Sequence, residues 1–232
     1  GYGSSLKFKL TVGSQTTSAY STSLRYTSPA VSGLAVSTTT MNTAGNQAIT
    51  ITGSNFGPQD SNNVIAATFG VSGTGYTATS CSVTSANSEI TCTSPAGVGA
   101  NHKWLVTVGG QTSALSSATL SYTAPAITDV SLASVSTLGT DGGESIVIEG
   151  SNFGPTSGNP VAVTYGGANG ESFTASSCSV SVAHTRVTCT SAPGYGSSLK
   201  FKLTVGSQTT SAYSTSLRYT SPAVSGLAVS TT

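Results

Sequence analysis

Charge is almost absent from this chain of 232 residues. Only 6% of the residues are charged, the formal net charge is +1, and lysine and arginine form no block. Without a basic patch the chain has no electrostatic attraction for nucleic acid or for an anionic membrane surface, so neither partner is expected. No apolar run reaches the roughly 18 residues of a membrane span, so we expect no membrane insertion in this segment.

The residues of catalysis are scarce as well. The chain has two histidines and seven aspartates and glutamates, and it lacks a nucleophile motif. Neither a serine, histidine and aspartate arrangement nor a pair of hydrolytic carboxylates has its parts. We therefore expect no enzyme, no catalytic residue and no cofactor.

No segment shows helical periodicity of useful length. Short alternating runs recur instead, broken by glycine, proline, asparagine and serine, as in Leu6–Val12, Ala48–Thr52 and Ser145–Glu149. Alternation with a period of two is typical of strands that bury one face. The sequence predicts an all-β protein.

An internal repeat dominates the sequence. Residues 1–39 are identical to residues 194–232, an offset of 193, and a weaker period of 97 relates Gly53–Pro58 to Gly150–Pro155. The exact identity indicates one of two things. Either the polypeptide is long and carries near-perfect two-domain repeats, or the protein forms a repeating assembly whose map was averaged over its copies. In the second case the identity partly reflects how the sequence was assigned to that map. Both alternatives predict a fibre.

Three prolines, Pro29, Pro125 and Pro222, each follow a strand that ends in tyrosine, and they mark the joints between domains. We expect the C-terminal part of one domain at 1–28, complete domains at 29–124 and 125–221, and the first strand of a further domain at 222–232. Both ends then fall inside a domain. The chain is expected to be a window on a longer series, or to be completed by neighbouring copies.

Four cysteines are present, two in each complete domain. Cys81 and Cys92 are symmetric about residues 86–87, and Cys178 and Cys189 about residues 183–184, so a two-residue turn would place each pair opposite on adjacent strands. We expect two disulfides. The alternative is a pair of buried free thiols in each domain, while a zinc site lacks two further ligands. Disulfides indicate an oxidising compartment, hence an extracellular or cell-surface location.

The order of these features resembles the IPT/TIG family of immunoglobulin-like domains. An initial proline and apolar strand (Pro125–Val130) precede a strand with Gly-Ser-Asn-Phe-Gly, two cysteines, Thr-Ser-Pro, and a last strand ending in tyrosine. The resemblance covers nearly the whole chain and implies tandem immunoglobulin-like β-sandwiches. Such domains occur in receptor stalks, in surface proteins, beside starch-active enzymes and in transcription factors. The basic loops of the transcription factors have no counterpart here.

Several single residues carry expectations of their own. Gly-Ser-Asn-Phe-Gly predicts a turn with positive φ angles, with Phe56 and Phe153 closing the end of each sandwich. Trp104 is expected in the core. The repeat has Leu199 where His102 would recur and Asn87 where His184 would, so both histidines are expected to be solvated or to lie in turns. Four tyrosines are expected to be exposed and leave room for a binding surface: Tyr2, Tyr76, Tyr195 and Tyr213.

Acidic residues gather only at Asp129, Asp141, Glu144 and Glu149. These oxygens are a weak signal for calcium between domains, and the preceding domain does not repeat them. We therefore expect no metal site.

Serine and threonine make up about a third of the chain, and no asparagine lies in an Asn-x-Ser/Thr site. We expect O-linked glycans, because uncharged domains in an array need protection from association. The alternative is that these are ordinary hydroxyls on strand surfaces. The candidate positions are Thr16, Thr17, Ser18, Ser37, Thr38, Thr39, Thr40, Ser116 and Ser117.

Together these features favour a non-enzymatic structural repeat of an extracellular fibre or surface stalk, whose partners are copies of itself, end to end or laterally. The second hypothesis is an adhesin or receptor ectodomain that binds a glycan or a protein. An accessory module of a carbohydrate-active enzyme is the third.

Overall fold

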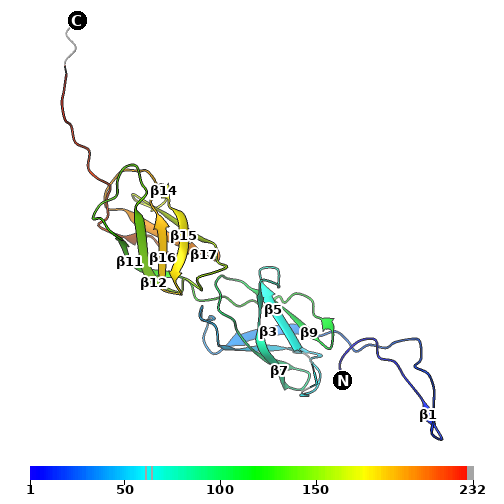
Figure 1. Ribbon diagram of the computed structural model, residues 1–232. Helices are drawn as coiled ribbons and strands as arrows, with labels where there is room; N and C mark the ends of the chain where they lie inside the picture. The colour runs from blue at the N-terminus through cyan, green and yellow to red at the C-terminus, as the bar shows by residue number, and fades with distance from the viewer. Residues whose placement is uncertain (61, 64, 229–232) are drawn as a thin grey trace. The chain divides into compact units, whose positions relative to one another are not determined.

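The structure is a computed structural model that describes residues 1–60, 62–63 and 65–228 (Figure 1). The chain divides into two compact units, with the boundary between Thr123 and Ala124. Nineteen strands are present, and no helix occurs in the described part of the chain. The all-β prediction is confirmed.

Two four-stranded antiparallel sheets build the first unit. One has the order β3-β4-β8-β7, formed by Ala30–Val36, Ala48–Ser54, Glu89–Thr93 and Thr79–Ser85. The other has the order β10-β9-β5-β6, formed by Gln111–Thr112, Lys103–Val108, Ile65–Gly70 and Tyr76–Thr77. This is a sandwich of two sheets.

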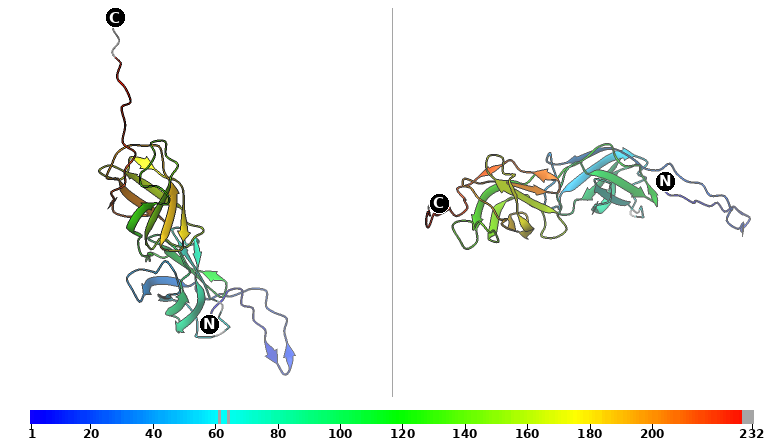
Figure 2. Two further views of the ribbon diagram at one scale, coloured as in Figure 1. Left: turned by 60° about the vertical axis from the view of Figure 1, so that its left-hand side comes forward. Right: turned by 90° about the horizontal axis from the view of Figure 1, so that it is seen from above.

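The second unit repeats the same topology (Figure 2). Its first sheet has the order β11-β12-β16-β15, formed by Ala126–Leu132, Ser145–Ser151, Arg186–Thr190 and Ser176–Val182. The second sheet has the order β14-β13-β17-β18, formed by Phe173–Thr174, Val161–Gly166, Lys200–Val205 and Gln208–Thr209, with β19 (Tyr213–Ser214) also on β17. The weaker period of 97 residues therefore corresponds to the length of one sandwich domain.

Each core is built from the inward members of the alternating strands. In the first unit Ile49 and Ile51 of β4 are fully buried, and Phe69 of β5 stacks on Trp104 of β9 with ring centroids 4.3 Å apart. In the second unit Tyr165 of β13 stacks in the same way on its neighbour in β17, at 5.0 Å. The prediction that Trp104 is a core residue is confirmed.

Residues 1–28 contain a short hairpin, β1 (Thr11–Val12) paired with β2 (Gln15–Thr16). Phe8, Leu10 and Val12 are 60%, 64% and 66% exposed. The identical segment in the second unit is β17, whose Phe201, Leu203 and Val205 are fully buried. The same sequence buries its apolar face only where β13 pairs beside it and a second sheet covers it.

Candidate interaction surface

The Gly-Ser-Asn-Phe-Gly segment ties each sandwich to the chain that enters it. In the first unit a Cβ on Gly53 would lie 2.0 Å from the Ala30 carbonyl oxygen, so only glycine allows this approach. Asn55, with φ 63°, donates from Nδ2 to the Ser28 carbonyl at 3.1 Å. Phe56 is fully buried. The motif is a structural turn.

The second unit contains the same arrangement. A Cβ on Gly150 would lie 2.0 Å from the Ala126 carbonyl oxygen, Asn152 has φ 62° and donates to the Ala124 carbonyl at 3.1 Å, and Phe153 is fully buried. The predicted turn and the two plugging phenylalanines are confirmed. Each asparagine fixes the backbone just before a joint proline.

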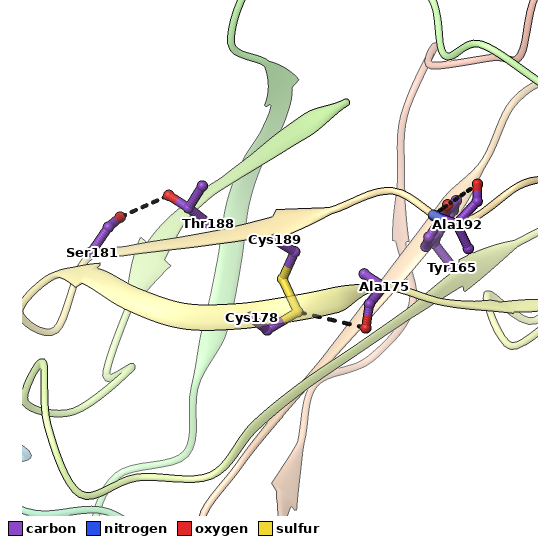
Figure 3. The surroundings of a disulfide bond; sticks show 7 residues. All are labelled: Tyr165, Ala175, Cys178, Ser181, Thr188, Cys189 and Ala192. Carbon is purple, nitrogen blue, oxygen red and sulfur yellow. Dashed lines mark hydrogen bonds between the residues drawn. A yellow bond between two sulfur atoms is a disulfide. The ribbon is translucent and has the colours of Figure 1, made fainter. Parts of the chain in front are cut away.

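Both cysteine pairs form disulfides, Cys81 with Cys92 and Cys178 with Cys189, and in each pair the Cα atoms are 4.1 Å apart. Figure 3 shows the second bond bridging adjacent strands, with the hydroxyls of Ser181 and Thr188 hydrogen-bonded at 2.9 Å farther along the same two strands. The bridges join an edge strand of the first sheet, β7 or β15, to its inner neighbour. Each bridge therefore anchors one edge strand of its sheet covalently.

The expected pairing around each hairpin is also present. Val83 faces Ile90, and Val180 faces Val187. A register shift lies beside each disulfide, between the first strand residue and the fourth. The symmetry of the sequence predicted the facing pairs but not these bulges.

The expectation for His102 is wrong. Its side chain is only 4% exposed, Nε2 donates to the Val98 carbonyl at 3.0 Å, and the rings of Phe69, Tyr76 and Tyr122 surround it edge-on at 5.4 to 5.7 Å. Burial lowers the pKa of His102. His102 therefore belongs to the core as a neutral ring.

His184 matches its expectation. It lies in the turn between β15 and β16 with φ 67°.

Buried His102 makes the first domain sensitive to acid. The folded pKa lies below the ordinary value of 6.5. As the pH falls through 6.5 the unfolded chain binds a proton that the folded domain refuses, so stability present at higher pH is lost until the folded pKa is reached. We expect the urea midpoint of the Trp104 fluorescence transition to fall across this window. His102→Leu, which installs the residue found at Leu199, should abolish the fall, and equal midpoints for the unchanged protein on both sides of pH 6.5 would contradict the prediction.

Of the four tyrosines expected on the surface, one is widely exposed. Tyr195 is 79% exposed. Tyr2 and Tyr76 both pack against the first core, and the Tyr76 hydroxyl donates to the Val98 carbonyl at 3.0 Å. The Tyr213 hydroxyl donates to the Thr128 carbonyl at 2.6 Å. The predicted tyrosine set is therefore wrong as a set, because hydrogen bonds and ring packing withdraw three of its members.

The candidate O-glycan positions fall into two groups. Ser116 is corrected: it is 3% exposed, and its Oγ accepts from Trp104 N at 2.9 Å and donates to the Ala118 carbonyl at 2.6 Å, so no sugar fits there. Thr40 is half-buried and shares a hydrogen bond of 2.7 Å with Thr123. The others are exposed: Thr16, Thr17, Ser18, Ser37, Thr38, Thr39 and Ser117.

Carboxylates in the second unit serve local structure. Glu144 accepts from Ser191 Oγ at 2.6 Å and from Gly139 N at 2.8 Å, and the serine hydrogen bond is the main reason that the pKa of Glu144 is lowered. Glu149 pairs with Arg186 at 2.6 Å. Within the described residues, histidine, cysteine, aspartate and glutamate side chains form no group of three suited to a metal ion. Nor does that part of the chain contain a helix with the length and apolarity needed to cross a membrane.

Comparison with solved structures finds proteins of low sequence identity. The chain is similar to a surface glycan-binding protein, SGBP-B, from Bacteroides uniformis (16% identity, TM-score 0.31, covering 79% of this chain and 48% of that one). It is also similar to PbSGBP-B from Prevotella bryantii (15%, 0.46, 82% and 42%) and to the adhesin InvE from Yersinia pseudotuberculosis (14%, 0.42, 80% and 58%). The chain spans less than half of either glycan-binding protein.

Comparison with curated proteins gives no match. The family model described as the IPT/TIG domain matches twice, over residues 34–124 and 125–220. These two segments include both disulfides and both Gly-Ser-Asn-Phe-Gly turns. The chain therefore belongs to the IPT/TIG family of immunoglobulin-like domains, with two matched copies in tandem.

Proposed function

We propose that this chain is a non-enzymatic structural segment of an extracellular fibre or surface stalk, in which copies of the two-domain unit follow one another. The observation that carries the proposal is the identity of residues 1–39 with residues 194–232. Repetition of a self-contained sandwich extends the reach of a protein without new chemistry. In this proposal the domains run over 29–124 and 125–221, with parts of their neighbours at 1–28 and 222–232.

The exposed face of residues 1–28 supports a continuous series. Its apolar side chains, Phe8, Leu10 and Val12, are more than half exposed, although their identical counterparts form the core of the second unit. Exposed contiguous apolar surface is unfavourable in an isolated soluble chain. Strands like β13, β11 and β12, supplied by a preceding domain, would cover this face.

The disulfides support the location. A disulfide persists in an oxidising compartment, and each bridge here ties an edge strand to its inner neighbour. In a secreted array each disulfide would stabilise the domain that contains it and would not link one domain to the next.

A second candidate is an adhesin or receptor module that binds a glycan or a protein. The observation in its favour is Tyr195, an exposed aromatic ring that lines a hollow together with Arg218 and the hydroxyl-bearing residues Ser197 and Thr220. Aromatic rings beside hydroxyls and a guanidinium are suited to partly polar ligands.

A binding assay separates the two candidates. The chain is applied to a glycan array and to immobilised surface proteins, with Tyr195→Ala as the matched variant. The structural proposal predicts no saturable binding at micromolar concentration. Saturable binding that Tyr195→Ala abolishes would overturn it in favour of the adhesin.

We further propose that exposed hydroxyls of the array carry O-linked glycans, at the seven exposed candidate positions. The intact mass of native material tests this. We expect the native mass to exceed that of the bare polypeptide by whole sugar masses that β-elimination removes. A mass equal to that of the bare polypeptide would exclude the modification.

A further inference from the structure

Residues 222–228 extend away from the sandwich of the second unit (Figure 1). A hollow of about 560 Å³ lies where they begin. Its lining consists of Thr140, residues 195–197 and residues 218–222. Tyr195 contributes an aromatic ring that is 79% exposed. Its ring lies edge-on to Phe173, with centroids 5.7 Å apart.

The same lining occurs a second time in the chain. Residues 195–197 and 218–222 are identical in sequence to residues 2–4 and 25–29. Those earlier copies lie in the first unit, in contact with the complete domain that follows them. The first unit therefore shows which contacts residues of this sequence make with a domain that follows them in the chain.

In the first unit the Tyr2 ring packs on two glycines of the following domain. A Cβ on Gly109 would lie 2.6 Å from Tyr2 Cδ2, and a Cβ on Gly57 would lie 3.0 Å from Tyr2 Cδ1. Both glycines have positive φ, 53° and 79°. The tyrosine ring thus covers bare backbone at the β9–β10 turn and at the Gly-Ser-Asn-Phe-Gly turn.

Hydrogen bonds fix the same contact. Gln111 donates from Nε2 to the Tyr26 carbonyl at 2.8 Å, and Asn55 donates from Nδ2 to the Ser28 carbonyl at 3.1 Å. Tyr26 and Ser28 correspond to Tyr219 and Ser221 of the hollow. The following domain therefore presents two amide donors to the backbone that lines the hollow.

We propose that the Tyr195 hollow is the docking surface for the next repeat of this chain. Its occupant is the turn with the sequence of residues 109–111, with the loop around the counterpart of Gly57 beside it. The proposal rests on the proposed function, since it needs a domain that follows residue 232. The hollow is suited to backbone, because its tyrosine ring would pack on glycine. Its carbonyl groups would accept hydrogen bonds from side-chain amides of the next repeat.

The tyrosine of this contact follows the exact repeat of 193 residues and not the weaker period of 97. The position of Tyr195 is occupied by Val98 in the first domain, whereas Tyr2 and Tyr195 stand 193 residues apart. A contact of this kind, with tyrosine packed on the following domain, then recurs once in every two domains.

Tyrosine nitration followed by tryptic mapping tests the proposal. Trypsin separates Tyr2, in peptide 1–7, from Tyr195, in peptide 187–200. In the present chain we expect Tyr195 to react several-fold faster than Tyr2. In a chain continued after residue 232 by a second copy of residues 40–124, Tyr195 should slow to the rate of Tyr2.

Amide hydrogen exchange supplies the reciprocal readout. In the continued chain Tyr195→Ala should speed exchange at the added copy of residues 109–111 several-fold, and in the present chain it should leave exchange at residues 109–111 unchanged. Unaltered Tyr195 nitration in the continued chain, with the added domain folded, would overturn the docking surface and leave the array intact. Protected Tyr195 without filaments in native material would retain the docking surface and overturn the proposed function.

Discussion

Replacing Phe56 by alanine is expected to lower the free energy of unfolding of the first domain by about 3–5 kcal/mol. Phe56 is fully buried and belongs to the core that contains Trp104 and Phe69. Truncation leaves a cavity beside Gly53, whose backbone cannot move in to fill it because it already lies against the Ala30 carbonyl. Trp104 is the one tryptophan of the chain, so its fluorescence in urea follows this domain alone.

The chain offers a matched control for this experiment. Phe153 holds the same position in the second domain and is equally buried. Phe153→Ala should leave the Trp104 transition in place while lowering protection from hydrogen exchange in residues 125–221. A loss below about 1 kcal/mol for Phe56→Ala would show that the ring does not plug the sandwich.

Removing the disulfide of the first domain is expected to cost about 2–3 kcal/mol. The bridge between Cys81 and Cys92 closes a loop with a sequence separation of 11 and joins the edge strand β7 to β8. The double replacement Cys81→Ala with Cys92→Ala avoids leaving a free thiol. Its urea midpoint, again from Trp104, should fall accordingly.

Two controls test whether the fall comes from the disulfide of the first domain. Reduction of the unchanged protein should produce a similar fall, and the double replacement Cys178→Ala with Cys189→Ala should not move the Trp104 transition. Equal midpoints for the oxidised and reduced protein would contradict a stabilising role. The bridges would then contribute no measurable free energy to folding.

Local patterns were sufficient for much of this fold. Alternation fixed the faces of β4 and β12, because a strand with one buried face has a period of two. The symmetry of each cysteine pair about its turn fixed the facing of Val83 with Ile90. The glycine and asparagine of the turn motif were predictable because positive φ angles favour those residues.

Burial of polar residues was harder to predict, because it depends on residues distant in sequence. His102 stands between Asn101 and Lys103, and its polar neighbours hide that three aromatic rings distant in sequence enclose it. The informative signal was its counterpart, Leu199, since an apolar residue at the repeated position marks a buried site. An apolar counterpart is thus a sign of burial, whereas the polar counterpart of His184, Asn87, lies in a turn as His184 does.

The same reasoning applies to Tyr76 but not to Ser116. Tyr76 has an aromatic counterpart, Phe173, and each ring packs against an aromatic residue of the adjacent strand. The environment of Ser116 had no such signal, because its hydroxyl accepts from a backbone amide of β9 that only the folded sheet brings near. Abundant hydroxyls are therefore partly a means of completing strand hydrogen bonds where the neighbouring strand departs.

Electron cryomicroscopy of native material tests the central claim, that this chain is a segment of a structural array that repeats every 193 residues. The account predicts filaments whose axial repeat corresponds to two sandwiches, about 60–80 Å if each domain extends about 30–40 Å along the axis. Within that repeat the contact between the Tyr195 hollow and the next copy should occur once. Isolated single chains with no axial repeat would contradict the account.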